Sequence, residues 1–400
     1  YMAVFGHSGS QAPQFIHSSV IMIAIAFLFL NNVNLCKIKC NSLHKQIIMT
    51  LAERKSAFIK LGKFLSQFTT KNNLQKDNIQ GNDIFFEELV QLIKLSQSHN
   101  GWFTPNQVYF AIESWAEALT EDNLNKWLAA YELENVKPKT VGLILAGNIP
   151  LVGFHDFLSV LIIGHNVLVK TSSNDQKLLP FLAKYLISVE PKFADRVTFT
   201  DGKLEGFDAV IATGSNNTAR YFEYYFKDVP AIIRKNRNSV AVLTGNESKE
   251  ELIALGEDIF RYFGLGCRNV SKLFVPKGYD FTAFFEAMYE YSDVIHYEKY
   301  ANNYDYNKAV FLMSEFKILD NGFLTIKEDK SYSSPISSVF YEYYENTKEL
   351  QERFDAQNEQ IQCVVGTHVN DNYLPFGQTQ KPQLWDYADN VDSILFLSKI

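Results

Sequence analysis

The sequence contains few cysteines, little excess positive charge and no long apolar run. Its 400 residues include 4 cysteines, which is too few for a disulfide framework and favours a reducing, cytoplasmic compartment. The formal net charge of -7 excludes the basic footprint of a nucleic-acid-binding protein, so we expect no nucleic-acid partner. The apolar run Val20–Leu30 is too short to cross a bilayer, which takes about 20 residues.

Several motifs with a known chemistry are also missing. No pair of histidines or cysteines has the spacing of metal ligands, so we expect no metal. No Ser-His-Asp grouping is recognisable. The dinucleotide fingerprint GxGxxG is absent as well, because Ala219 stands where a later glycine would follow Gly214.

Residues 1–48 differ in character from the rest of the chain. The segment begins with Tyr1, and its apolar run has neither a preceding Lys or Arg nor a following A-x-A site, so it is not typical of a signal peptide. From Met49 onward the sequence reads as the start of an amphipathic helix. We interpret Met49 as the true start and residues 1–48 as a non-native leader; a degenerate membrane anchor is the alternative.

The remaining chain predicts an α/β protein with an N-terminal helical region, residues 49–135, in which apolar residues recur at helical spacing. Short β-rich runs then alternate with helices, which predicts a doubly wound parallel sheet. We expect a nucleotide-binding domain at 136–235, a catalytic domain at 236–365, and a C-terminal segment, 366–400, that completes the cofactor domain or contacts another subunit. Its last apolar run, "SILFL", is predicted to be a strand that pairs with another element or subunit, and we expect a homo-oligomer.

Cys267 is the candidate nucleophile. Ser248 and Glu251 form a capping box that opens a helix, and Gly264 is placed to end that helix in a left-handed conformation. Cys267 therefore lies on a turn before the strand "KLFVP", where the charge of Arg268 would favour the thiolate. The alternative is that Cys267 is a small buried hydrophobic residue.

Three further loops follow predicted strands, and the carboxyl ends of parallel strands are where such sheets bind ligands. Asn148 is either a turn former or an amide donor to an oxyanion. Gly214 and Ser215 open a helix whose backbone N–H groups suit a phosphate. Lys170 ends a strand and either holds a ribose or phosphate or is simply solvated.

Four segments, taken in order, resemble the aldehyde dehydrogenase superfamily and within it the LuxC-type acyl-CoA reductases. The resemblance covers roughly residues 100–400 and rests on "LAGNIPLVGFHDFLSVLIIGHNVLVKTSSND", "ATGSNNTARYF", "FGLGCRNVSKLFVP" and "LPFGQTQKPQLWDYADNVDSILFL". It implies an aldehyde dehydrogenase-like fold, in which a doubly wound cofactor domain accompanies an α/β catalytic domain.

The resemblance also implies a mechanism. The Cys267 thiolate attacks the carbonyl of an acyl-CoA or another acyl thioester, while the Asn148 amide and the Cys267 N–H hold the oxyanion. A nicotinamide hydride then releases an aldehyde. Whether CoA or a partner protein carries the acyl group stays open. Phe376, in the Pro-Phe-Gly element, is implied in the substrate pocket, and the residues implied in binding the cofactor are Lys170, Thr171, Ser172, Ser173, Gly214 and Ser215.

Three departures from the pattern sharpen this reading. Ile233 stands near the position where hydrolytic members carry a glutamate, which favours thioester reduction over acid formation. Ser173 stands where relatives that prefer NAD often carry a glutamate, so we predict NADPH. The element "SYSSPISSV" replaces one that grips the nicotinamide ribose. The alternatives are a hydrolytic NAD(P)-dependent aldehyde dehydrogenase and, in another class, a non-catalytic α/β nucleotide-binding protein.

Overall fold

The computed structural model describes residues 49–133, 136–367, 369, 370 and 372–400. The predicted leader, with its apolar run and with Cys36 and Cys40, lies outside these residues. Thr50–Ile400 form one compact unit, to which everything below refers. Within the described residues, no helix is long and apolar enough to cross a membrane.

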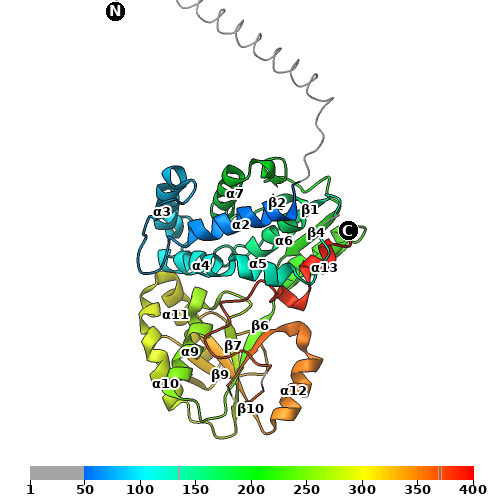
Figure 1. Cartoon of the computed structure of the whole chain (residues 1–400). Helices are drawn as coiled ribbons and strands as arrows, with labels where there is room; N and C mark the ends of the chain where they lie inside the picture. The colour runs from blue at the N-terminus through cyan, green and yellow to red at the C-terminus, as the bar shows by residue number, and fades with distance from the viewer. Residues whose placement is uncertain (1–48, 134–135, 368, 371) are drawn as a thin grey trace, which may run out of the picture. The chain divides into compact units, whose positions relative to one another are not determined.

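The unit begins with four helices, as the periodicity of the sequence predicts. Thr50 and Glu53 form a capping box that opens the first of them, and Thr104 caps the third, in which proline occupies the first turn. The apolar faces of these helices are buried, and Figure 1 shows the four helices in blue to cyan. They are α2 (Leu51–Leu65), α3 (Asn82–His99), α4 (Pro105–Ala118) and α5 (Glu121–Leu128).

The first sheet contains five parallel strands in the order β3-β2-β1-β4-β5. This order confirms the predicted doubly wound sheet, and it places the reversal of strand order between β1 and β4. The strands are β1 (Thr140–Ile144), β2 (Asn166–Lys170), β3 (Val197–Phe199), β4 (Ala209–Thr213) and β5 (Ala231–Arg234). The connecting helices are α6 (Phe154–Ile163), α7 (Leu178–Val189), α8 (Asn216–Tyr225) and the 3-10 turn η1 (Pro191–Phe193).

The second sheet contains six strands in the order β11-β6-β7-β10-β9-β8, and β8 is antiparallel to its neighbour. Its main hydrophobic core lies between the sheet and helices α9 and α10. The strands are β6 (Asn238–Val242), β7 (Val270–Pro276), β8 (Ile318–Asp320), β9 (Thr325–Glu328), β10 (Ser338–Tyr344) and β11 (Ile361–Val365). The helices are α9 (Lys249–Phe260), α10 (Thr282–Met288), α11 (Glu298–Met313), α12 (Thr347–Ala356) and the 3-10 turns η2 (Arg261–Gly264), η3 (Tyr289–His296) and η4 (Asn358–Gln360).

The prediction of a final strand at "SILFL" is wrong, because this segment forms helix α13 (Ser393–Leu397), drawn in red in Figure 1. Asp392 caps the helix by accepting a hydrogen bond from the N–H of Leu395 at 2.8 Å. Ile394 and Leu397, three residues apart, then face the same side and are both fully buried where α13 packs on α6. The apolar run alone is compatible with a strand or a helix, and the Asp392 cap and the helical spacing of the buried residues favour the helix. The turn η5 (Ala388–Asn390) precedes this helix.

Candidate active site

A cavity of about 700 Å³ lies at the carboxyl ends of β1 and β4, where the strand order reverses. The turn before β7 and the C-terminal segment complete its wall. The cavity brings together four of the residues singled out in the sequence, although they come from three separate loops. These are Asn148, Gly214, Ser215 and Cys267.

The turn that carries Cys267 has the predicted left-handed backbone at Gly264 but differs from the prediction in where helix α9 ends. Helix α9 already ends at Phe260, and Tyr262, Phe263 and Gly264 all have positive φ, at 54°, 58° and 76°. Left-handed backbone costs a non-glycine residue roughly 1–2 kcal/mol, so the surroundings must hold this stretch in place. Both aromatic side chains are buried, and the Tyr262 N–H donates to Gln107 of α4 at 3.1 Å.

Asn269 explains why the helix ends early. Its buried side-chain amide donates to the carbonyl oxygens of Asp258 (3.0 Å) and Arg261 (2.7 Å), which the end of α9 leaves without helical partners. Its Oδ1 accepts from the Gly266 N–H at 2.8 Å. One side chain therefore closes the helix and fixes the residue directly before Cys267.

The Cys267 thiol is partly buried, and burial raises its pKa. The main-chain N–H groups of Arg237 and of Cys267 itself act in the opposite direction and lower the pKa, whereas the charge of Asp389 raises it further. The Arg268 guanidinium donates to the Thr379 carbonyl oxygen, and the cation whose charge lowers the pKa of the thiol is Arg237. The positive charge that favours the thiolate therefore comes from Arg237 and not, as expected, from Arg268.

Asn148 follows β1 and contacts the turn that carries Cys267. Its Nδ2 donates to the Leu265 carbonyl oxygen at 2.7 Å, two residues before Cys267. A primary amide has two N–H groups, so this bond fixes the side chain and leaves a second donor for a ligand. The preceding Gly147 is required by packing, because a Cβ there would lie 2.6 Å from the Ser172 hydroxyl.

Gly214 and Ser215 connect β4 to α8 at the other side of the strand-order reversal. Ser215 caps α8 by accepting a hydrogen bond from the Thr218 N–H at 3.2 Å. A Cβ on Gly214 would lie 3.0 Å from the Phe222 ring and from Thr218, so a larger residue here would have to displace one of these side chains. The first N–H groups of a helix that begins at a cavity wall are suited to bind a phosphate.

The second group of implied cofactor residues lies at the end of β2, beside β1. Lys170 is in register with Ile144 and accepts a hydrogen bond from the Leu145 N–H through its carbonyl oxygen. Thr171 and Ser172 are partly buried, Ser173 is exposed, and none of the four lines the cavity. Asn174, the next residue, does line it.

Phe376, implied in the substrate pocket, does not line this cavity. Its side chain is 6% exposed and belongs to the hydrophobic core between α9 and the second sheet. The element around it is held by Asp258 of α9, whose carboxylate accepts hydrogen bonds from the Gly377 N–H (2.7 Å) and the Thr379 N–H (3.0 Å). The structure therefore places Phe376 in the scaffold that positions the C-terminal wall of the cavity.

A group of charged residues at the cavity could not be predicted from the sequence. Asp156 of α6 pairs with Arg234 of β5 at 2.6 Å, and Asp389 of η5 pairs with Arg237 at 3.2 Å. These residues are scattered over more than 230 positions, so no spacing in the sequence linked them. Ile233 lies in the same strand as Arg234 but does not line the cavity.

The cavity also has an apolar side, formed by one face of α4. The four residues of α4 that line the cavity recur at helical spacing. They are Ala111, Ser114, Trp115 and Ala118. From the sequence this spacing predicts a helix but not a cavity wall.

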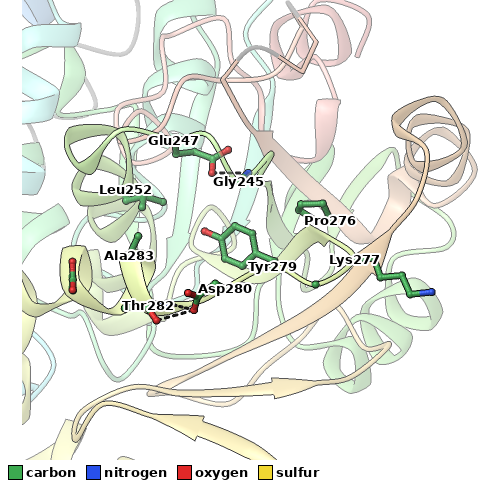
Figure 2. Close-up of a pocket in the computed structure, with 11 residues that line it drawn as sticks. Gly245, Glu247, Leu252, Pro276, Lys277, Tyr279, Asp280, Thr282 and Ala283 are labelled. Carbon is green, nitrogen blue, oxygen red and sulfur yellow. Dashed lines mark hydrogen bonds between the residues drawn. The ribbon is translucent and has the colours of Figure 1, made fainter.

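A second hollow of about 570 Å³ lies between the loops that follow β6 and β7 and shares no residue with the first. Figure 2 shows two of its acidic residues engaged by their own turns: Glu247 accepts from the Gly245 N–H, and Asp280 accepts from Thr282. In the part of the chain that the structure describes, no group of three His, Cys, Asp or Glu side chains is arranged to hold a metal ion.

Solved structures with a similar fold are aldehyde dehydrogenases. An NAD+ complex of the Bacillus cereus enzyme is 15% identical, with a TM-score of 0.57, over 81% of this chain and 73% of that chain. The indole-3-acetaldehyde dehydrogenase of P. syringae, in complex with NAD+ and IAA, is 12% identical, with a TM-score of 0.57, over 81% and 73%. Aldehyde dehydrogenase 21 of Physcomitrella patens, in complex with the reaction product succinate, is 15% identical, with a TM-score of 0.55, over 81% and 74%.

At these identities the similarity establishes the fold. None of the curated proteins matches the chain. The family model described as Acyl-CoA reductase (LuxC) matches residues 71–287, which is more than half of the chain. The protein therefore has the aldehyde dehydrogenase fold and belongs to the LuxC acyl-CoA reductase family, whose members are oxidoreductases of aldehyde chemistry.

Proposed function

We propose that the protein reduces an acyl-CoA, or a related acyl thioester, to an aldehyde through a thioester on Cys267, with NADPH as the reductant. The observation that carries this proposal is that Asn148 and Cys267 line one cavity and that the Asn148 side chain is bonded to the turn of the nucleophile. Membership of the LuxC family supports the choice of an acyl thioester as substrate.

In this mechanism Cys267 attacks the thioester carbonyl, and the second amide N–H of Asn148 and the Cys267 N–H stabilise the oxyanion. The thiol of the substrate leaves, and the acyl group stays on Cys267. The apolar face of α4 receives the acyl group, because it forms the side of the cavity with few polar groups. A reduced nicotinamide, when bound, supplies the hydride that converts the acyl group to the aldehyde.

The residues present fit such a cofactor. The start of α8 at Gly214 and Ser215 would hold a phosphate, and it stands at the strand-order reversal where dinucleotides bind in doubly wound sheets. Lys170 and the segment Thr171–Ser173, at the end of β2, would hold the adenosine ribose. Ser173 is exposed, and a hydroxyl there accommodates a 2′-phosphate that a carboxylate would repel.

Product analysis separates this function from the hydrolytic alternative. We expect acyl-CoA and NADPH to yield free CoA and aldehyde, and aldehyde with NADP+ to yield little free acid. Acid as the sole product would contradict the proposal. Ser173→Glu tests the cofactor: its KM for NADPH should rise by more than its KM for NADH, and equal changes would contradict the preference.

The non-catalytic alternative predicts a different thiol. A buried, purely structural Cys267 would react with iodoacetamide only in denaturant, whereas a thiol that lines an open cavity reacts in the native protein. Cys363, buried in β11, serves as an internal control for the structural behaviour.

A further inference from the structure

Four charged side chains form a cluster at the cavity, where the β5–β6 connection passes from one sheet to the other, and three of them, Asp156, Arg234 and Asp389, line it. Two ion pairs, Asp156 with Arg234 and Asp389 with Arg237, make up this cluster. Each of the four side chains is at most 14% exposed. The pairs are close enough to interact, because the charges of Arg234 and Asp156 both act on Asp389.

Arg237 connects this cluster to the nucleophile. Its main-chain N–H and its charge both lower the pKa of the Cys267 thiol, while its guanidinium binds the Asp389 carboxylate. Its Nη1 also donates to the Asn358 carbonyl oxygen at 2.7 Å, which fixes the side chain. Asp389 and Cys267 line the same cavity, and Arg237 acts on both of them.

The backbone at Asp389 is held in an unusual conformation. Asp389 and Asn390 have φ values of 59° and 56°, and the Asp389 N–H donates to Gln362 Oε1 at 3.1 Å. Gln362 itself lines the cavity. Strained positions of this kind recur at active sites because the strain directs a side chain where relaxed backbone would not.

We propose that Asp389 carries the proton for acyl transfer to Cys267, an inference that rests on the proposed function. The carboxylate accepts the proton of the Cys267 S–H as the sulfur bonds to the thioester carbonyl carbon. When the bond between that carbon and the sulfur of the substrate breaks, the same proton passes to the departing thiolate. A neutral thiol enters the step and a neutral thiol leaves, so no other reactant is needed.

The electrostatics of the cluster suit this exchange. Burial raises the pKa of the Cys267 thiol, so the resting thiol is protonated and needs a base. Burial also raises the pKa of Asp389, while Arg237, Arg234 and the Lys235 N–H oppose that shift and Asp156 adds to it. A carboxyl group with a raised pKa remains a far stronger acid than a thiol, so it can protonate the leaving group.

The test compares wild type with Asp389→Asn, since asparagine tolerates the left-handed backbone. Asp305→Asn, on the exposed face of α11, is the matched control. Three rates are measured by mass spectrometry: alkylation of Cys267 by iodoacetamide as a function of pH, acylation by octanoyl-CoA, and acylation by S-octanoyl 4-nitrothiophenol. The nitrothiophenolate leaves without a proton, and alkylation needs only the thiolate.

We expect Asp389→Asn to shift the alkylation profile to lower pH, because a negative charge near the sulfur is lost. Acylation by octanoyl-CoA, which needs Asp389 both as base and as acid, should slow by about 100-fold or more, whereas acylation by the nitrothiophenyl ester, which needs only the base, should slow by at least about 10-fold less. Asp305→Asn should match wild type in all three.

Acylation of Asp389→Asn by octanoyl-CoA at the wild-type rate would overturn the inference. So would an equal loss of all three rates, which would show that Asp389 only maintains the structure of the turn. If octanoyl-CoA fails to acylate wild type, the proposed function fails instead. S-ethyl thiooctanoate, whose leaving thiolate also needs a proton, then replaces octanoyl-CoA and still decides the role of Asp389.

Discussion

Asp258 of α9 holds the C-terminal wall of the cavity. Its replacement by asparagine tests whether the buried negative charge lowers the stability of the folded protein. The fully buried carboxylate accepts three hydrogen bonds, from the Gly377 N–H (2.7 Å), the Thr379 N–H (3.0 Å) and the Thr379 hydroxyl (2.8 Å). Burial opposes these bonds and prevails, raising the pKa of Asp258 to about 6. Asparagine resembles the protonated carboxyl in size and carries no charge.

The magnitude follows from proton linkage. The folded protein binds this proton more tightly than the unfolded chain, whose pKa is 3.8, so the contribution of Asp258 to stability is complete below about pH 4 and is lost as pH rises through about 6. A shift of about two units corresponds to about 3 kcal/mol. Wild type and Asp258→Asn should therefore be about equally stable at pH 4, and the variant should be more stable by about 3 kcal/mol at pH 7.

Urea unfolding of both proteins between pH 4 and pH 7 measures this difference. Burial also raises the pKa of Asp175 to about 6. Asp175 therefore adds its own pH dependence to the stability, but equally in both proteins, so it does not affect the difference between them. A variant that is less stable than wild type at pH 7 would refute the reasoning, since it would mean that the three hydrogen bonds outweigh burial of the charge.

Three other substitutions probe the site. Asn148→Ala should slow acylation of Cys267 by about 100- to 1,000-fold while leaving its alkylation nearly unchanged, and an unchanged acylation rate would exclude the oxyanion role. Asn269→Ala removes the bonds that close α9 and hold Gly266, so it should lower the free energy of unfolding by about 2–4 kcal/mol in urea titrations and slow acylation; unaltered stability would contradict its role as a cap. Ala111→Leu narrows the cavity at a buried position of its wall and should move the preference towards shorter acyl chains in competition assays. Ala116→Leu, which lies outside the wall, should leave the preference unchanged. The same acyl preference in both variants would contradict an acyl site on α4.

Much of the fold could be predicted from local patterns. The helix of residues 51–65 and the strands of the first sheet follow from spacing and composition, because each element buries one face that the sequence displays. The capping box of Ser248 and Glu251 marks the start of α9 correctly. The end of that helix could not be predicted from Gly264 alone, because Asn269, eight residues beyond Arg261, closes it from a distance.

Cys267 and Asn148 could be proposed as site residues from motifs, but their electrostatic surroundings could not be predicted. Arg268 is adjacent to Cys267 in sequence, yet the guanidinium that acts on the thiol belongs to Arg237. Asp389 reaches the same cavity from the C-terminal segment, and only the packing of η5 against the β5–β6 connection brings it there. The position of Phe376 could not be predicted for a related reason: tertiary packing turns its ring into the core and not towards the cavity.

The central claim is that Cys267 accepts the acyl group. Intact-mass analysis after incubation with acyl-CoA, without a reductant, tests it most directly, and wild type is compared with Cys267→Ala and with Cys363→Ala as the matched thiol control. We predict one acyl adduct on wild type and on Cys363→Ala, and none on Cys267→Ala. An adduct that persists in Cys267→Ala, or that is missing from wild type while the acyl-CoA is turned over, would contradict the account.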